Sequence, residues 1–196
     1  RLYKVVFREK DMVEPKENKY PFDLLDYYKN PEKYRSKFSK YLTHLTVLIN
    51  CIYWEPRYPK FIKNSDLKTL FQSQKKPRLR IIGDISCDIE GSIECTRYST
   101  TPENPTYLFD PVKGKIKNDG KEKGVAVMSI DNLPAEIPLE SSIFFSKTLK
   151  SFIPDIAHAD YSEEFDRCEL PIPVKKAVIL YKGEFTPNYK YMEKYI

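Results

Sequence analysis

Three short apolar runs constrain the fold of this chain more than any other feature. They cover residues 45–52, 78–85 and 124–130, and each leads into a polar residue. The first run is continuously apolar and rich in β-prone side chains, which is typical of a buried parallel strand. Because helix-length segments lie between the runs, the pattern predicts an α/β fold built on a parallel sheet.

The remaining segments carry weaker signals. Apolar residues at helical spacing, preceded by a polar cap or a proline, predict helices over 30–42, 64–71 and 138–151. Residues 86–123 contain repeated prolines and glycines, which indicates a long irregular excursion with at best a short hairpin. The tail over 186–196 alternates tyrosine with lysine, and we expect it to be an exposed docking tail.

Composition narrows the class of function. Lys and Arg number 33 against 28 Asp and Glu, a net charge of +5 that does not demand a nucleic-acid partner, and we expect none. No apolar stretch is long enough to predict a membrane span. The four cysteines form no CxxC pair, so we expect reduced thiols in an intracellular compartment, with Cys51 buried. The two isolated histidines suggest no metal site or nucleophile.

Ligands in parallel α/β sheets bind beyond the carboxyl ends of the strands. Tyr53 follows the first run and could pack against a nicotinamide or a ribose, although ordinary aromatic packing explains it as well. Backbone groups at Ile85 could contact a ribose or an amide, or could simply form a turn. Asp131 and Asn132 could pair with a carboxamide, or could belong to a plain strand-to-helix connection.

Four motifs occur in an order that resembles one known family. They are LINCIYWE (48–55), DIS (84–86), GSIE (91–94) and SIDNLPA (129–135). Together they resemble the lysine-ketoglutarate reductases, which are also the N-terminal activity of bifunctional aminoadipic semialdehyde synthase. Fungal saccharopine dehydrogenases are similar in a weaker way. The resemblance extends over residues 2–195 and corresponds to the C-terminal portion of the reductase.

This resemblance implies a two-domain enzyme similar to alanine dehydrogenase. Such an enzyme joins lysine to 2-oxoglutarate in the mitochondrial matrix and reduces the imine with NADPH, which gives saccharopine during lysine degradation. The implied fold is a partial Rossmann-like parallel sheet with a C-terminal helical return and tail. Residues 1–135 would be the C-terminal half of a dinucleotide-binding domain, with the insertion at 86–123, and residues 136–196 would pack on the substrate domain.

The resemblance also implies positions that contact NADP or NAD: Tyr53, Ile85, Ile130, Asp131, Asn132 and Leu133. The family's general acid, general base and Gly-rich phosphate loop have no counterpart in this chain, so we assign no catalytic residue and no metal. Two residues depart from the family pattern. Cys87 replaces a small alanine, and Glu90 replaces a glycine, where a carboxylate would restrict backbone approach and repel a phosphate.

Two functions remain open from the sequence. In the first, the chain is the cofactor-side half of a saccharopine-forming oxidoreductase, and a missing N-terminal portion or a companion chain supplies the rest of the active site. In the second, it is a non-catalytic degenerate relative that serves as a structural subunit of a larger mitochondrial assembly. Because the chain opens on Arg1, we expect a processed product or part of something longer.

Overall fold

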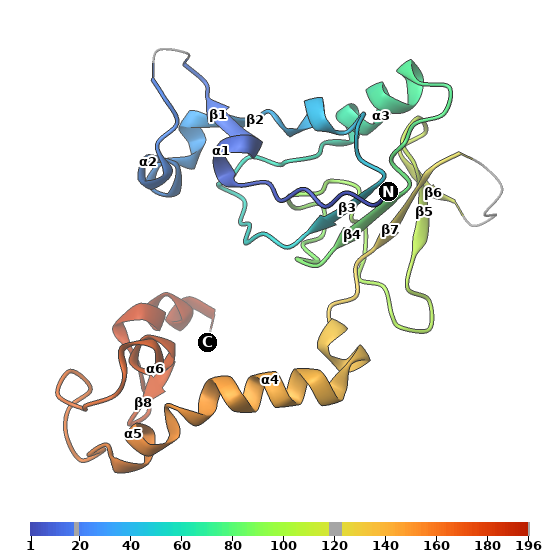
Figure 1. The fold of residues 1–196 in the computed structure, drawn as a ribbon. Helices are drawn as coiled ribbons and strands as arrows, with labels where there is room; N and C mark the ends of the chain where they lie inside the picture. The colour runs from blue at the N-terminus through green and yellow to red at the C-terminus, as the bar shows by residue number, and fades with distance from the viewer. Residues whose placement is uncertain (18–19, 118–122, 196) are drawn as a thin grey trace. The chain divides into compact units, whose positions relative to one another are not determined.

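The computed structural model describes residues 1–17, 20–117 and 123–195. The chain divides into two compact units, Arg1–Glu136 and Ile137–Ile196, hereafter the first and the second unit (Figure 1). The proposed roles of 1–135 and 136–196 in cofactor and substrate binding remain predictions.

A five-stranded mixed sheet forms the centre of the first unit. Its spatial order is β3-β4-β7-β5-β6, and β3, β4 and β7 run parallel. The strands are β3 (Val47–Asn50), β4 (Ile81–Asp84), β5 (Tyr107–Asp110), β6 (Lys115–Lys117) and β7 (Val125–Met128). The α/β fold with a partial Rossmann-like sheet is therefore confirmed. The hairpin expected within 86–123 is β5–β6, which extends the sheet beyond β7, while residues 118–122 lie outside the described residues.

The core lies on one face of this sheet. Helix α3 (Asn64–Ser73) connects β3 to β4 and buries Leu67 and Leu70, which belong to the same apolar cluster as Ile82 and Val127. The helix begins at Asn64 because the carboxylate of Asp66 accepts the backbone N–H of Lys63 at 2.9 Å. Figure 1 shows α3 and the paired strands β1 (Val13–Pro15) and β2 (Tyr34–Ser36) on one side of the sheet.

The helix predicted over 30–42 does not form. The segment is divided into η1 (Pro31–Lys33), β2 (Tyr34–Ser36) and η2 (Phe38–Tyr41), and β2 pairs antiparallel with β1 (Val13–Pro15). Helix α1 (Glu9–Met12) and helix α2 (Leu24–Lys29) complete this region. Tyr34 and Phe38 are buried, so the apolar residues were identified correctly although their backbone conformation was not.

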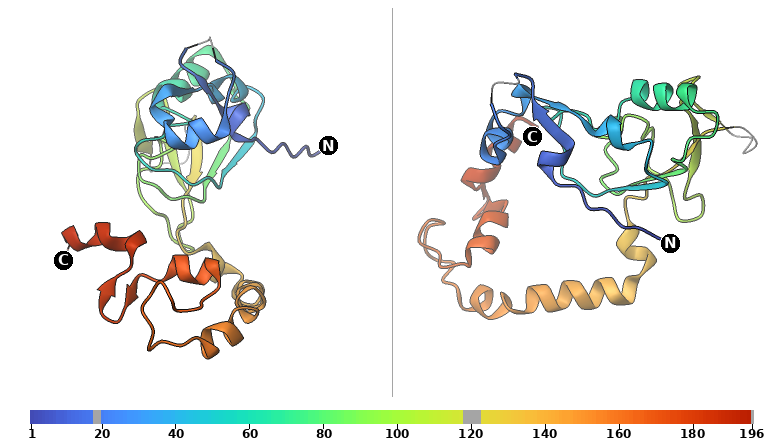
Figure 2. Two further views of the ribbon diagram at one scale, coloured as in Figure 1. Left: turned by 90° about the vertical axis from the view of Figure 1, so that its left-hand side faces the viewer. Right: turned by 45° about the horizontal axis from the view of Figure 1, so that its top comes forward.

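The second unit is mostly helical. It contains α4 (Pro138–Lys150), α5 (Ile153–His158), α6 (Ile172–Ala177), β8 (Leu180–Tyr181), β9 (Glu184–Phe185) and η4 (Pro187–Tyr195). Helix α4 confirms the helix predicted over 138–151, and Figure 2 shows it as a continuous rod. The 186–196 tail exposes Tyr191 and Tyr195, but a docking role remains a prediction. In the described part of the chain, every helix is too short or too polar to cross a bilayer.

Candidate functional site

The three parallel strands end at a common edge of the sheet. Asn50, the last residue of β3, pairs with Asp84 of β4, and Gly83 pairs with Met128 at the end of β7. The residues that leave these strands therefore lie at neighbouring positions. This geometry places Ile85 directly after β4 and 130–133 directly after β7, at the edge where ligands bind in such sheets.

A buried polar network fastens the ends of β3 and β4 together. Asp84 is fully buried, and its carboxylate accepts hydrogen bonds from Asn50 Nδ2 at 2.8 Å, Ser86 Oγ at 2.7 Å and Thr96 Oγ1 at 2.5 Å. Asn50 Nδ2 also donates to Ser92 Oγ at 2.9 Å. The three donors to Asp84 are neutral, so this carboxylate is satisfied by hydrogen bonds from uncharged groups.

The loop that follows β4 is anchored at its far end by Glu94. One carboxylate oxygen of Glu94 accepts the Asn64 N–H at the start of α3 at 2.8 Å, and the other pairs with Lys60 Nζ at 2.9 Å. Burial by itself would raise the pKa of Glu94, but these two partners hold it below its usual value. The loop is therefore held both at the sheet, through Asp84, and at α3.

The exit of β7 is held by residues of the 86–123 excursion. Thr100 N–H donates to the Ser129 carbonyl at 2.8 Å, and Thr100 Oγ1 accepts Ser129 N–H at 3.0 Å. A parallel bridge between Thr100 and Ile130 continues this pairing, and Ile130 is buried. Asp131 and Asn132 are consequently exposed just before η3 (Leu133–Glu136).

Contacts between the exit loops bring them together. A Cβ on Gly91 would lie 3.1 Å from Trp54 Cε3, so the β3 and β4 loops touch at this glycine. Burial, followed by the carboxylates of Asp84, Asp131 and Asp88, raises the pKa of the Cys87 thiol in the β4 loop.

Tyr53 differs from the other predicted site residues. Its side chain is 81% exposed, whereas Ile85 is partly buried and Ile130 is buried. The structure thus brings Ile85 close to 130–133 and leaves Tyr53 extending into solvent at the same edge. Cys51, predicted to be buried, is also exposed, because β3 forms the edge of the sheet.

The two departures from the family pattern share one backbone feature. Cys87 has a φ of 54° and Glu90 a φ of 50°, and both values lie in the left-handed region that favours glycine. The Glu90 carboxylate forms an ion pair with the guanidinium of Arg97, so its charge is partly compensated. Within the described residues, no group of three or more His, Cys, Asp or Glu side chains could hold a metal ion.

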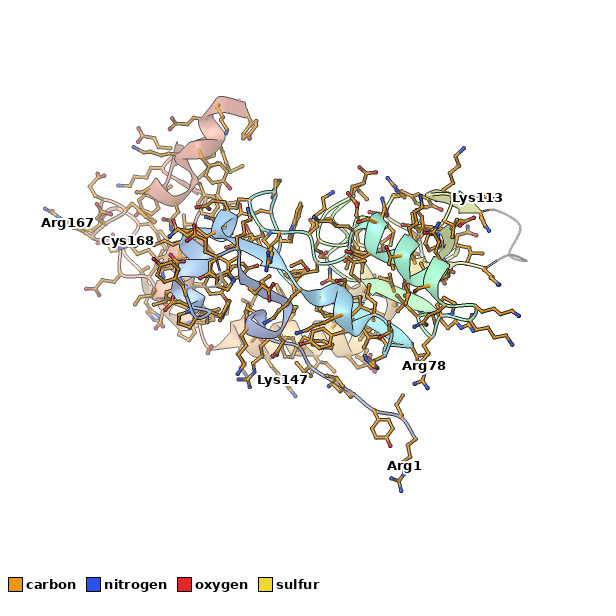
Figure 3. The ribbon with its side chains drawn as sticks, turned by 90° about the horizontal axis from the view of Figure 1, so that it is seen from above. Arg1, Arg78, Lys113, Lys147, Arg167 and Cys168 are labelled. Atoms are coloured by element: carbon orange, nitrogen blue, oxygen red, sulfur yellow. The ribbon has the colours of Figure 1, made fainter. Side chains whose placement is uncertain are left out.

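Charge is distributed unevenly between the two ends of the parallel strands. The carboxyl edge and its loops carry Asp84, Asp88, Glu90 and Asp131, whereas the segment that enters β4 is basic. Figure 3 shows Arg78 of this basic segment extending from the ribbon. Negative charge near the candidate site disfavours a phosphate there and favours neutral, hydrogen-bonding parts of a ligand.

Sequence reasoning overlooked the residues that hold the site together. Ser92, Thr96 and Thr100 belong to the segment that was predicted to be an irregular excursion, yet all three are buried and hydrogen-bonded to the strand ends. The signal available in the sequence was the GS pair at 91–92, where the glycine has no room for a side chain.

No protein-family model matches the chain, but several individual proteins are similar to it. Alpha-aminoadipic semialdehyde synthase of Arabidopsis thaliana is 34% identical over 197 residues, which cover 99% of this chain and 18% of that protein. The mitochondrial protein of the same name from Bos taurus is 32% identical over 186 residues, or 88% of this chain and 20% of that protein. Saccharopine dehydrogenase [NAD(+), L-lysine-forming] of Schizosaccharomyces pombe is 31% identical over 136 residues, or 66% of this chain and 33% of that protein.

The chain spans about a fifth of the length of the two synthases and a third of that of the dehydrogenase. Over nearly all of its own length, however, it aligns with proteins of one kind. The chain belongs to the family of alpha-aminoadipic semialdehyde synthases and saccharopine dehydrogenases.

Proposed function

We propose that this chain contributes the cofactor-side half of the active site of a saccharopine-forming lysine-ketoglutarate reductase. The observation that carries the proposal is the interlocking of three parallel strand exits at one sheet edge, in a chain related to aminoadipic semialdehyde synthase. The names of the fungal relatives include NAD(+), which supports a nicotinamide cofactor. Lysine, 2-oxoglutarate and saccharopine are the substrates and product that follow from this assignment.

The residues present fit the nicotinamide and ribose end of such a cofactor. Asp131 and Asn132 are exposed and offer both an acceptor and a donor for a carboxamide, and Tyr53 offers an exposed ring. The backbones of Ile85 and 130–133 would line the floor between them. When bound, the cofactor would supply a hydride for imine reduction, while these residues would orient its ring and exclude water.

The residues of this chain do not fit the phosphate end of the nicotinamide cofactor. The exit loops carry Asp88, Glu90 and Asp131, and the nearby Arg97 is paired with Glu90. A pyrophosphate beside these carboxylates would be repelled. We therefore assign phosphate binding, together with the general acid and base, to a complementary polypeptide portion outside these 196 residues.

The second unit fits a role in joining the two portions. Helix α4 exposes Leu139, Phe144 and Phe145, which are 67%, 74% and 65% accessible. Apolar side chains of this size are normally buried against a partner, which supports the expectation that 136–196 packs on a substrate domain. A mitochondrial location is part of the proposal, because the related mammalian proteins are named mitochondrial.

The single tryptophan provides a direct test, since Trp54 lies at the exit of β3. The chain, co-expressed with the Arabidopsis thaliana reductase region lacking the matched segment, is titrated with NADPH and NADH. The Trp54 signal is the tryptophan emission that is lost in the same complex made with Trp54→Phe. We expect saturable quenching, and Asp131→Ala should weaken binding about fivefold, because about 1 kcal/mol of hydrogen bonding is lost. Asp155→Ala, an exposed aspartate of α5, is the matched control and should have no effect.

Turnover separates this proposal from the structural-subunit alternative. The same preparation is supplied with lysine, 2-oxoglutarate and NADPH, and formation of saccharopine is measured by mass spectrometry. A complex that assembles but neither quenches Trp54 nor forms saccharopine would support the non-catalytic alternative and overturn the proposal.

A further inference from the structure

One face of the parallel part of the sheet is uncovered. Val47 and Ile49 of β3 and Ile81 of β4 are 47%, 54% and 41% exposed. They lie on the same face, because Val47 pairs with Ile81 and Ile49 with Gly83. The alternate residue Ile82 faces the opposite way into the core and is fully buried.

This exposure conflicts with what the sequence of β3 requires. The 45–52 run is apolar at positions that face both ways, which is the pattern of a strand buried on both faces. Purely parallel strands are found almost only where helices cover both faces of the sheet. The aliphatic residues on the outer face therefore correspond to a buried environment that this chain does not provide in the described structure.

The topology explains why the outer face has no cover in the first unit. The chain moves from β3 through α3 to β4 and on to β7, always in the same direction across the sheet. Right-handed crossovers that progress in one direction place their helices on one face. In a doubly wound sheet, the second face is covered by helices whose strands extend from the opposite edge, which here is the free edge of β3.

The uncovered face continues to the candidate site. Beyond β3, Cys51 and Tyr53 are exposed in the same alternation as Val47 and Ile49. Strand β3 is the terminal strand of the sheet, so its outer backbone groups have no strand partner within the described residues. An apolar face, an open strand edge and Tyr53 thus form one continuous surface.

We propose that this surface, the outer face of β3–β4 together with the free edge of β3, is the docking site for a second α/β segment. That segment lays an amphipathic helix on Val47, Ile49 and Ile81 and adds a parallel strand beside β3. Its source is the polypeptide portion that the semialdehyde synthases possess in addition to the 18–20% matched by this chain. The inference rests on the proposed function for the identity of the partner, and on packing alone for the location of the surface.

Assembly is tested with the co-expressed Arabidopsis thaliana reductase region described above, using light scattering coupled to size-exclusion chromatography. Wild type should form a one-to-one complex, and Ile49→Asp should weaken it at least a hundredfold by burying an unpaired charge. Val112→Asp is the matched control, since Val112 is 45% exposed but follows β5, away from the β3 edge. Ile49→Asp should lower the melting temperature of the isolated chain by about 4 °C at most, because the side chain is half exposed there.

Thiol labelling gives a second measurement on the wild-type chain. Cys51 should react with a maleimide in the isolated chain and become protected in the complex, while the fully buried Cys95 stays unreactive in both. Unchanged labelling of Cys51 in a verified complex, or equal binding by Ile49→Asp, would overturn the proposed surface. So would an isolated chain that dimerises through this face and is made monomeric by Ile49→Asp. A complex that assembles without forming saccharopine contradicts the proposed function alone.

Discussion

At Cys87 and Glu90, the loop after β4 has a backbone conformation that a glycine would adopt without strain. At position 90 we therefore predict that glycine is a more stable replacement than alanine, which is the reverse of their order inside a helix. Glu90→Ala and Glu90→Gly both remove the ion pair with Arg97, but only the alanine keeps a Cβ at positive φ. We expect Glu90→Gly to exceed Glu90→Ala by about 1 kcal/mol in free energy of unfolding, measured with urea.

The control for position 90 is the exposed Lys68 in the middle of α3, in the same unit, where alanine should be more stable than glycine by about 1 kcal/mol. If glycine were also the less stable replacement at position 90, the left-handed conformation of this residue would be refuted.

Glu94 gives a prediction about pH. Its pKa is lowered in the folded chain, so its contribution to stability is present above the usual value of 4.5 and is lost as the pH falls through the folded value. Glu94→Gln should therefore cost about 1 kcal/mol at pH 7, since it loses the charge at the start of α3 and the pair with Lys60. The difference from wild type should shrink in acid, as followed by urea unfolding between pH 7 and pH 3.

An exposed glutamate supplies the comparison for Glu94. Glu193→Gln in η4 should change stability little at any pH in this range. A cost for Glu94→Gln that stayed constant down to pH 3 would show that shape, and not charge, determines the contribution of Glu94.

Among the elements, the strands and long helices were predictable because their signals are local. The β3, β4 and β7 strands coincide with apolar runs, and α4 with helical spacing after Pro138. The 30–42 segment was mispredicted because its buried residues are placed by tertiary contacts: Tyr34 OH is shared between the Asp23 carbonyl and Asp26 Oδ2, each at 3.1 Å. Periodicity identifies which side chains are buried, but it cannot detect a strand partner such as β1.

The candidate site was predictable to a similar extent. Strand ends gave Ile85 and 130–133, because parallel strands end at one edge regardless of sequence detail. Thr96 and Thr100 were not predictable, since they reach Asp84 and Ser129 through a loop whose path no periodic pattern records. Long-range hydrogen bonds between buried polar groups depend on the completed fold.

Removing one hydroxyl tests this account of the 30–42 segment. Tyr34→Phe should lower the free energy of unfolding by about 1 kcal/mol, because a part-buried hydrogen bond between α2 and β2 is lost while the ring stays packed. Tyr28→Phe is the matched control. Tyr28 OH donates to Glu9 at an exposed position, and exposed polar contacts contribute little, so this substitution should cost less than about 0.5 kcal/mol. Both variants are measured by thermal and urea unfolding. If Tyr34→Phe cost no more stability than Tyr28→Phe, the tertiary explanation of the 30–42 segment would be contradicted.

In the whole molecule, stability should be concentrated in the first unit. The apolar core cluster extends from Met12 to Val127, whereas the described residues of the second unit include two buried ones, Cys168 and Thr186. A 13-residue helix such as α4 is marginal in water unless it is packed. Opening free energies vary across a protein according to how much each region buries.

Hydrogen exchange measured by mass spectrometry should therefore separate the two units. We expect peptides that cover β4 and β7 to exchange at least about a hundredfold more slowly than peptides of α4, a difference of about 2.7 kcal/mol in opening free energy. Peptides of β5 serve as the internal control and should follow β7, to which this strand is paired. If α4 in the isolated chain were protected as strongly as β4, the second unit would be stabilised without a partner, and its exposed aromatic residues would no longer indicate a missing one.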